Sequence, residues 1–595
     1  MKNLTVLDCE VFPNYFLAAF KNINNCDIFT IEIVGENQTL SKPQIKKLKS
    51  LLFQCTTFGF NSNTYDIPII LYALQGKSCS RIYQLSNKII NGNLPQYQTL
   101  NIIDEQLPAG LNHFDISQPA PSVMVSLKLY GGRMNSQKIQ DLPFPVGSIL
   151  TKSDIINVKQ YCINDLDTTI ELYQTIESSI DLRVSMSEEY NQDLRSKSDA
   201  QIAETVIKSQ LEKHSNKKVI RPVINLNAKY QYLAPDYLEF KSEQLQNIFD
   251  IIKNHWFELD KKGSVKLPKA LSTARIKLGS TIYKIGIGGL HSQEKAQTLI
   301  PKSDELVCDR DAAAYYPNII LSLGLYPKHL GKDFLDVYRD IVERRLAAKK
   351  AGDKTQDAAL KVTINGSFGK LGSQYSLLYS PDLMLRVTLT GQLALLMLIE
   401  ELENNSIAVR SANTDGFVSI VPKKCYDLYD TICFNWELAT GFILEETQYK
   451  ALYSRDVNNY LAVTEYGVKG KGIFTLDSLN KNPKAPVCIR AIIEHLTTGA
   501  SIEDHIRSST NITDFLTVRK STGGAVWRGE YLGKVVRWIY STNGEKITNA
   551  VSGNKVASSD GARPLMDLET FPSDIDYQAY ITEAHKILDS LGIPS

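Results

Sequence analysis

The sequence predicts a protein of several domains that combines α/β and α+β regions. Its 595 residues correspond to some four domains or subdomains at about 150 residues each. Strand-like and helical segments alternate over residues 1–175, helical patterns dominate residues 333–402, and residues 406–475 contain short strand-like runs. Hydrophobic residues make up 43% of the chain and charged residues 22%, which excludes disordered and fibrous proteins.

Hydrophobic periodicity indicates the elements of the N-terminal part. Runs of β-branched and aromatic residues predict strands over 4–8, 15–20 and 27–34. The apolar spacing of residues 41–55 predicts a helix. Residues 154–220 are expected to be largely helical, with Asp154 as a helix N-cap.

Beyond residue 220, the hydrophobic pattern is at first weak and then predicts distinct elements from residue 300 onward. Between 220 and 300 the pattern is too weak to indicate a boundary. A strand and turn are expected over 300–325, two helices around residues 351–353, and a hairpin around the polar turn at 413–416. The final 120 residues have mixed patterns.

Charge and cysteine content exclude several classes of protein. Lys and Arg total 66 against 65 Asp and Glu, so a uniformly basic nucleic-acid binder is excluded and any positive surface must be local. Nine scattered cysteines without C-x-x-C spacing argue against zinc fingers and a disulfide framework. The N-terminus becomes acidic too early for a secretory signal, and the apolar run 393–399 is far shorter than the ~18 residues of a membrane span. We therefore expect a cytoplasmic protein with no membrane partner.

Three short motifs in the first 170 residues carry candidate acids. Asp8 and Glu10 end the first predicted strand and lie on one face, because side chains alternate along a strand. Carboxylates this close repel each other unless cations bridge them, and two divalent metals would do so. Asp66 follows an apolar run, while Tyr161 and Asp165 share a helical face. Taken singly, the D-x-E pair is more typical of a solvated surface than of a metal site, Asp165 also suits a surface acid, and Tyr161 also suits a core tyrosine.

The order D-x-E, N-x-x-x-x-D and Y-x-x-x-D resembles the 3′–5′ proofreading exonucleases with four catalytic acids. The resemblance implies metal binding by Asp8, Glu10, Asp66 and Asp165, orientation of the attacking water by Tyr161, and contact of Asn61 with the frayed 3′ strand.

A second group of motifs begins at LVCDRDAAAYYPNII, where Asp309 and Asp311 lie on one strand face and are both candidate ligands. The spacing to the following Tyr-Pro pair selects Asp311, because the segment resembles the D-x-x-S-L-Y-P motif of family B DNA polymerases. Ala314 stands where the family has serine. The resemblance implies that the ring of Tyr316 closes against the sugar and excludes a ribose 2′-OH.

Residues 339–370 contain eight basic and four acidic residues, a local excess of +4. A cationic helical hairpin suits a triphosphate, although a solvated charged face is the commoner meaning of such a stretch. Its K-x-x-x-N-G-S-F-G resembles the fingers motif K-x-x-x-N-S-x-Y-G, with mild departures at Gly366 and Phe368. The resemblance implies nucleotide binding by Arg345, Lys349, Lys361, Asn365 and Tyr316.

The predicted hairpin at 406–421 corresponds to the family motif Y-x-D-T-D-S. Asp415 matches its second acid, which with Asp311 would hold both metals. Asn413 replaces the first acid, and an amide can ligate a metal through its carbonyl but adds no charge. We expect activity to survive this replacement, because the resemblance makes Asp311 and Asp415 the essential pair.

The remaining motifs suggest contacts with DNA. The family K-x-Y primer motif has lost its lysine to Asn458, and GIGGLHS resembles a Y-x-G-G loop without its tyrosine. Glycines there permit close approach to a phosphate, and a plain turn is equally consistent with them. The resemblance implies DNA contacts by Gly288, Gly289, Tyr460, Lys469 and Lys471.

Together these motifs resemble a compact family B DNA polymerase of phages and mobile elements. The resemblance implies an RNase H-like exonuclease domain followed by a right-hand polymerase of palm, fingers and thumb. The expected domains are the exonuclease (1–180), a helical connector and start of the palm (181–300), palm with the first metal acid (301–335), fingers (336–370), palm with the second metal acid and primer contacts (371–475) and thumb (476–595).

The implied reaction is attack of the primer 3′-OH on the α-phosphate of a dNTP, on a primer–template DNA, with two Mg²⁺ per active site and Mn²⁺ as a substitute. Only 50 residues separate Asp311 from Lys361, and 50 separate Asn365 from Asp415, which leaves no room for protein-priming insertions. We expect ordinary primer extension with weak strand displacement and no terminal protein. A phage-encoded enzyme would work in the bacterial host cytoplasm.

Two other readings remain open. Asn413 and Asn458 also suit a nuclease whose polymerase half has become a DNA-binding platform, although Asp311, Lys361 and Asp415 argue against it. The other alternative is a nucleic-acid-binding structural protein without catalysis. Replisome partners and the role of residues 181–285 are not predicted, beyond helical packing.

Overall fold

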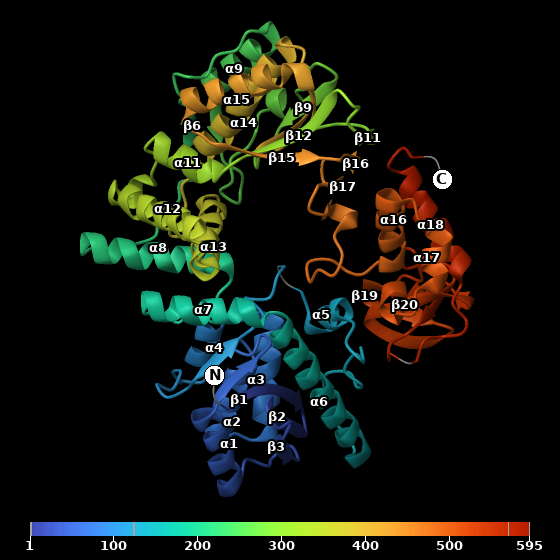
Figure 1. Ribbon diagram of the computed structural model, residues 1–595. Coiled ribbons are helices and arrows are strands. Elements are labelled where there is room, and N and C mark those ends of the chain that lie inside the picture. The colour runs from blue at the N-terminus through green and yellow to red at the C-terminus, as the bar shows by residue number, and fades with distance from the viewer. Residues whose placement is uncertain (1–2, 123–124, 569, 594–595) are drawn as a thin grey trace. The chain divides into compact units, whose positions relative to one another are not determined.

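The computed structural model describes residues 3–122, 125–568 and 570–593, and the chain divides into two compact units of mixed α and β structure (Figure 1). Unit 1 consists of Met1–Ser198, Asp477–Ala491 and Ser501–Ile581. Unit 2 consists of Asp199–Leu476, Ile492–Ala500 and Thr582–Ser595. The expected mixture of α/β and α+β regions is confirmed, whereas the boundaries of the six predicted segments stay predictions.

The N-terminal part of unit 1 is built on a five-stranded sheet of order β3-β2-β1-β4-β5. Its strands are β1 (Leu4–Phe12), β2 (Tyr15–Asn22), β3 (Ile28–Val34), β4 (Thr56–Gly59) and β5 (His113–Asp115). The first three form an antiparallel meander, and β4 and β5 run parallel to β1. The three strands predicted from apolar runs are therefore confirmed.

Helices cover both faces of this sheet (Figure 1). They are α1 (Lys42–Gln54), α2 (Asp66–Leu74), α3 (Cys79–Gly92), α4 (Gln96–Ile102), α5 (Leu127–Met134), α6 (Lys152–Thr175) and α7 (Glu177–Tyr190). Cys9 joins the core formed with α1, α2 and α3, whereas Val6 and Phe12 join the core formed with α6. Because side chains alternate along β1, Asp8 and Glu10 lie on the face turned toward α6.

The start of α6 corrects one detail of the sequence analysis. Thr151, not Asp154, is the N-cap, and its side chain accepts from the Asp154 N–H at 3.3 Å. Asp154 sits at the third helical position and accepts from the Thr151 N–H at 2.8 Å. The two residues form a capping box, in which a cap and an acid three residues later satisfy each other's amides.

The C-terminal part of unit 1 packs against the N-terminal part of the same unit. Its strands β19 (Thr517–Trp527), β20 (Glu530–Glu545), β21 (Thr548–Asn549) and β22 (Ala562–Pro564) form a sheet of order β21-β19-β20-β22. The fully buried guanidinium of Arg537 on β20 donates to the carbonyls of Ser136, Gln137, Leu565 and Met566. Through Arg537, these bonds connect residues 136–137 to β20 and to residues 565–566, all of which belong to the segment predicted as the thumb. The segment also contains η4 (Ile512–Phe515) and α17 (Ile502–Ser508), while α16 (Pro486–Thr498) and α18 (Tyr577–Asp589) are divided between the units.

Unit 2 is built on a seven-stranded antiparallel sheet of order β15-β12-β14-β13-β10-β9-β8. Its strands are β8 (Ile276–Leu278), β9 (Thr281–Ile285), β10 (Leu290–Ser292), β12 (Glu305–Ala312), β13 (Ala408–Asn413), β14 (Gly416–Pro422) and β15 (Leu444–Tyr449). A four-stranded sheet contains β11 (Gln297–Leu299), β16 (Ala451–Asp456), β17 (Asn459–Val463) and β18 (Val468–Lys471), and a small pair contains β6 (Lys229–Gln231) and β7 (Trp256–Glu258). The predicted hairpin is β13–β14, and it brings the turn at 413–416 next to the end of β12.

Helices make up much of the rest of unit 2. They are α8 (Asp199–Ser215), α9 (Glu243–Asn254), α10 (Lys269–Ser272), α11 (Tyr315–Ser322), α12 (Asp333–Ala351), α13 (Lys354–Leu371), α14 (Pro381–Asn404) and α15 (Tyr426–Thr440), with short 3-10 helices η1 (Lys328–Leu330), η2 (Lys423–Cys425) and η3 (Gly472–Phe474). Helix α14 is long and apolar enough to cross a membrane, but 78% of its apolar window is buried inside the protein, as in a core helix. The short strand-like runs expected over residues 406–475 are present as strands, and α15, which lies between them, was not predicted.

The predicted pair of helices around residue 352 is the hairpin α12–α13, which lies beside α8 (Figure 1). A Cβ at Gly366 would lie 2.6 Å from the Asp199 carbonyl oxygen and 2.9 Å from the Ala203 Cβ. Gly366 therefore permits the close approach of α13 and α8. Lys370 and Glu204 add an ion pair of 3.2 Å between the same two helices. Part of segment 181–285, for which the sequence predicts no specific role, thus supports the hairpin.

Candidate functional site

Unit 1 brings the predicted acids of the first group together between β1, α2 and α6. Asp8 and Glu10 come from β1. Asp66 is the first residue of α2, and its Oδ1 accepts from the Cys9 N–H at 2.9 Å. Asp165 lies on α6, one helical turn after Tyr161. The charges of Asp8, Asp165 and Asp66 all raise the pKa of Glu10, so the four carboxylates lie close enough to interact electrostatically.

Burial and mutual repulsion make this cluster hold protons strongly. Burial, followed by the charge of Asp165, raises the pKa of Asp8 to about 7. Burial and the neighbouring Asp8 raise the pKa of Glu10 well above its ordinary value. Burial and Asp8 likewise raise the pKa of Asp66. A divalent cation would relieve this repulsion, so the donor set of oxygen atoms fits Mg²⁺ or Mn²⁺.

Lys128 on α5 is a residue of this cluster that the motif analysis missed. Its ammonium forms an ion pair with Asp165 and lies 4.1 Å from the centroid of the Tyr161 ring. It lowers the pKa of Asp8, Glu10 and Asp165 against the effect of burial. Its only sequence signal is a single basic residue in a short helix, which no motif distinguishes from a surface lysine.

Asn61 lies at an exposed turn held by Asp115 of β5. The carboxylate of Asp115 accepts from the N–H groups of Asn61 and Asn63 at 2.9 and 3.0 Å. Asn61 has a positive φ of 60°, which asparagine tolerates better than most residues. Asp115 is a second residue that no local pattern revealed.

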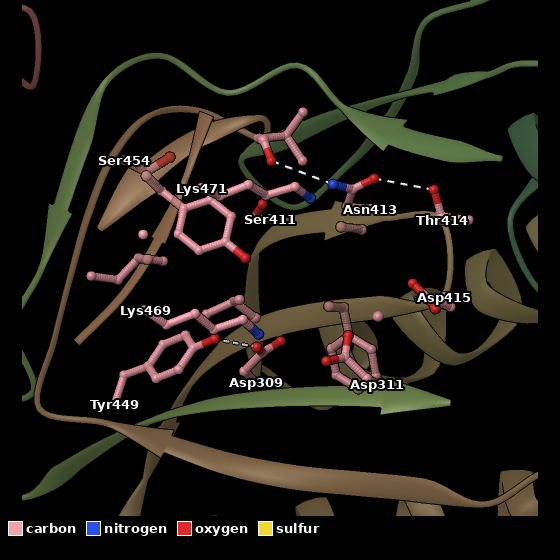
Figure 2. A pocket seen from close by; sticks show the side chains of 18 residues that line it. Asp309, Asp311, Ser411, Asn413, Thr414, Asp415, Tyr449, Ser454, Lys469 and Lys471 are labelled. Carbon is pink, nitrogen blue, oxygen red and sulfur yellow. Dashed lines mark hydrogen bonds between the residues drawn. The ribbon is translucent and has the colours of Figure 1, made fainter. Parts of the chain in front are cut away.

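Unit 2 brings the second pair of predicted acids to one cavity of about 520 Å³ (Figure 2). Asp311 lies near the end of β12, and Asp415 lies in the β13–β14 turn. The Asp415 carbonyl accepts from the Ala312 N–H at 2.7 Å, which fixes the turn against β12. Burial, followed by the charge of Asp311, raises the pKa of Asp415. Oxygen donors from β12 and from the β13–β14 turn therefore face one space, an arrangement that fits a hard divalent cation.

Asp309 is a third acid of the same cavity. It lies two residues before Asp311 on β12, and the Tyr449 hydroxyl donates to its carboxylate (Figure 2). Burial and then Asp311 raise its pKa to about 6, against a lowering by Lys469. Asp309 and Asp311, the two candidate acids on one face of the predicted strand, thus both line the cavity. The spacing of the motif had selected only Asp311.

Asn413 also lines the cavity, but its amide is engaged by neighbours. Its Nδ2 donates to the Val457 carbonyl at 3.4 Å, and its Oδ1 accepts from the Thr414 hydroxyl at 3.1 Å (Figure 2). The side chain is therefore fixed by local hydrogen bonds at the position where the resembled family has an acid.

The two lysines of VKGKG point into the cavity from β18. Lys471 pairs with Tyr460 across β17–β18, and its Nζ lies 5.7 Å from the centroid of that ring. Lys469, two residues earlier, lies on the same face of the strand. Both lysines line the cavity with the acids (Figure 2). Tyr460 also lines it. Asn458, in contrast, sits in the exposed β16–β17 turn.

The glycine loop lies against the acidic turn and the predicted sugar-selecting ring. The Leu290 carbonyl accepts from the Thr414 N–H at 2.7 Å. The Tyr316 hydroxyl donates to the Gly288 carbonyl at 2.5 Å, and its ring centroid lies 4.4 Å from that of Phe368. Gly288 and Gly289 thus have protein neighbours, and their contact with DNA stays a prediction.

The predicted triphosphate ligands lie on the α12–α13 hairpin. Lys361 and Asn365 are exposed on α13, with Phe368 half-buried one turn later. Arg345 pairs with Asp357 at 3.1 Å, and Lys349 pairs with Glu445 at 2.8 Å. Lys361 has no ion pair with any residue that the structure describes, so it is available to an anion.

No family model matches the chain. No curated protein matches it. Among solved structures, the chain is similar to the family B DNA polymerase from the hyperthermophilic archaeon Pyrobaculum calidifontis, with a TM-score of 0.41 and 14% sequence identity, over 99% of this chain and 77% of that chain. Function is therefore inferred from the residues of this chain.

Proposed function

We propose that the chain is a DNA-dependent DNA polymerase of the family B type with a 3′–5′ exonuclease. The observation that carries the proposal is the cavity of unit 2, where Asp311 and Asp415 face one space together with Lys469 and Lys471. A cavity lined by carboxylates and lysine ammonium groups suits a site that holds metal ions on the former and phosphates on the latter. The antiparallel sheet and the adjoining helical hairpin are consistent with a palm and fingers.

In synthesis, Asp311 and Asp415 would hold two Mg²⁺ ions, with Mn²⁺ as a substitute. Bound there, the cations would activate the primer 3′-OH and stabilise the pyrophosphate leaving group. Lys361 and Asn365 would bind the triphosphate from α13. Arg345 and Lys349 would join them after exchanging their present acidic partners for phosphate, since a bidentate or charge-assisted bond to phosphate is strong.

The remaining residues of unit 2 would position the substrates. The Tyr316 ring, whose hydroxyl is held by the Gly288 carbonyl and which contacts the Phe368 ring, would lie against the sugar and exclude a 2′-OH. Lys469, Lys471 and Tyr460 would contact the primer terminus, in place of the lysine missing at 458. Gly288 and Gly289 would approach the DNA backbone.

In proofreading, Asp8, Glu10, Asp66 and Asp165 would hold the metal ions of unit 1. Tyr161 would orient the attacking water, and the exposed Asn61 would contact the frayed 3′ strand. The sheet order β3-β2-β1-β4-β5, with an antiparallel meander and two parallel strands, is consistent with an RNase H-like domain.

We further propose ordinary primer extension for a phage or mobile element, in the host cytoplasm and without a terminal protein. The support is the compactness of unit 2: α11, η1, α12 and most of α13 lie between Asp311 and Asn365, and the end of α13, α14 and β13 lie between Asn365 and Asp415. Neither interval contains an inserted subdomain among the described residues.

The test is incubation of a 5′-labelled primer–template with Mg²⁺, with and without dNTPs. Wild-type protein should extend the primer with dNTPs and shorten it without them. Asp415→Ala should abolish extension and keep shortening, whereas Asp8→Ala/Asp66→Ala should do the reverse. Continued trimming by the double variant would refute the assignment of the nuclease acids.

The competing function is a nuclease whose unit 2 only binds DNA. Asn413 favours it, because this side chain supplies no negative charge and is engaged by Val457 and Thr414. Shortening alone in every condition, with unchanged DNA binding by Asp415→Ala, would replace the polymerase proposal by this one.

A further inference from the structure

The acidic cluster of unit 1 contains a sulfur atom. Cys162 is fully buried on α6 and lies one helical turn before Asp165, on the same side of the helix. Its Sγ and carboxylate oxygens of Asp8 and Glu10 all lie within 4.8 Å of one another. The thiol donates to Oδ2 of Asp8 at 3.5 Å. Three potential ligand atoms from two elements therefore converge on one point.

Glu10 gives an independent indication that this point is a cation site. Its half-buried carboxylate takes part in no hydrogen bond or ion pair with the residues that the structure describes. Buried charges are normally paired or bound to a metal.

The spacing of the three atoms suits a small tetrahedral cation. Bonds of about 2.0 to 2.3 Å place the ligand atoms of Zn²⁺ about 3.5 Å apart. The separation of Cys162 Sγ and Asp8 Oδ2 is 3.5 Å. An oxygen of the Glu10 carboxylate lies within 4.8 Å of both atoms.

We propose that Cys162 is a sulfur ligand of the exonuclease centre, which therefore binds thiophilic divalent cations such as Zn²⁺ and Cd²⁺ more tightly than Mg²⁺. This inference rests on the proposed nuclease function of unit 1. On binding, a sulfur–metal bond forms and the thiol proton leaves to water, with no change of oxidation state. Thiolate is a soft ligand that favours these ions, whereas Mg²⁺ prefers oxygen donors and octahedral geometry.

The cavity of unit 2 offers no such ligand, since no cysteine lines it. Cys308 on β12 is buried in the hydrophobic core instead. Thiophilic cations at low concentration should therefore occupy the exonuclease centre first and stop trimming while primer extension in Mg²⁺ continues. Such ions would act as a selective block on proofreading.

The chain offers a matched control in Cys9. This residue lies between Asp8 and Glu10 on β1, but its side chain joins the core on the opposite face of the strand. Cys9→Ala and Cys162→Ala each remove one buried thiol. The first thiol lies on one face of β1, and the second lies on the opposite face, where Asp8 and Glu10 point. Other cysteines contribute the same background in both variants.

The experiment is a titration of the metal-free, full-length protein with Cd²⁺ alone, followed by the ultraviolet charge-transfer absorption of cadmium thiolate. Wild type and Cys9→Ala should share a saturable component that Cys162→Ala lacks, with Cd²⁺ affinity about tenfold or more weaker in the latter. Equal titrations of all three folded proteins would overturn the proposal.

A second measurement uses the wild type and does not depend on the folding of a variant. X-ray absorption of protein loaded with one equivalent of Zn²⁺ should show one Zn–S bond of about 2.3 Å beside oxygen ligands. A shell of oxygen and nitrogen alone would overturn the proposal. Absence of Mg²⁺-dependent trimming would instead refute the proposed nuclease and leave the sulfur site standing.

Discussion

Asp311 and Gly416 face each other across the β12–β14 pair so closely that a Cβ on residue 416 would overlap the Asp311 carboxylate. The absence of a side chain at 416 is what allows Asp311 to turn toward the cavity it shares with Asp415. Glycine in this turn therefore serves the geometry of the acids as well as the bend of the hairpin.

Gly416→Ala should consequently displace the Asp311 carboxylate. A misplacement of about 1 Å in an active site costs about 100-fold in rate, so we expect primer extension to fall by about that factor. Single-turnover extension measures the effect, and trimming by unit 1 in the same sample is the internal control. Normal extension would show that Asp311 does not need its present orientation.

Local patterns predicted the elements that carry most of the acids. The alternation in β1 gave the shared face of Asp8 and Glu10, and the helical spacing gave that of Tyr161 and Asp165, because both depend only on nearby residues. Lys128 is 37 residues from its partner Asp165. Such a contact depends on tertiary packing, and no periodicity in one sequence encodes it.

Helix α15 shows that local sequence patterns can also fail to predict secondary structure where tertiary packing decides it. Its sequence is rich in aromatic and β-branched residues, which favour strands when read locally. In the structure, Trp436 packs into the core of unit 2 and its indole N–H donates to the Ala394 carbonyl of α14 at 2.8 Å. Packing against α14 thus overrides the local preference.

Tyr316 should select deoxyribose through its ring. Tyr316→Ala removes the ring between Gly288 and Phe368, and we expect ribonucleotide incorporation relative to deoxyribonucleotide to rise about 10- to 100-fold. Competing dNTP and rNTP extension measures the ratio. Tyr316→Phe, which keeps the ring and loses only the hydrogen bond to Gly288, should remain selective. An unchanged ratio in the alanine variant would mean that another ring guards the sugar.

Gly366 should be needed for the close packing of α13 against α8, and not for the formation of helix α13 itself. Gly366→Ser restores the serine of the resembled motif, yet its Cβ would meet the Asp199 carbonyl at 2.6 Å. Overpacking of this kind costs about 1–3 kcal/mol, and urea unfolding should show it. Gly369→Ser, where nothing lies within 4 Å of the added Cβ, should instead gain up to about 1 kcal/mol, since glycine is unfavourable inside a helix. Equal stability of the two variants would contradict the close approach of α8.

Asp309 should supply negative charge that Asn413 lacks. Because the pKa of Asp309 is raised to about 6, the carboxyl is ionised above that pH and neutral below it. The Mg²⁺ concentration for half-maximal extension should rise as pH falls through 6. Asp309→Asn should raise it about tenfold at pH 7 and remove this pH dependence, since a tenfold change corresponds to about 1.4 kcal/mol of lost attraction. Restoration by Asn413→Asp in the Asp309→Asn background would support one shared role, and no change in either variant would exclude it.

The charge of Lys128 should determine the lowest pH at which the exonuclease trims the primer. Its ammonium lowers the pKa of Asp8, Glu10 and Asp165, and these carboxylates must be ionised to bind a cation. In Lys128→Met the three pKa values rise, so protons compete with the metal up to a higher pH. The acid limb of the trimming rate should therefore move to higher pH by about one unit, and extra Mg²⁺ should partly reverse the shift.

Two variants separate this effect from a loss of structure. Lys128→Arg keeps the positive charge beside Asp165 and should keep the acid limb near its wild-type position. Lys21→Met removes another lysine that pairs with α6, through Asp167, but not with the acids of the cluster, so its profile should also stay unchanged. A profile that does not move in Lys128→Met would mean that its charge is not coupled to metal binding. A uniform loss at every pH would instead assign Lys128 to the placement of Tyr161, whose ring lies 4.1 Å from its ammonium.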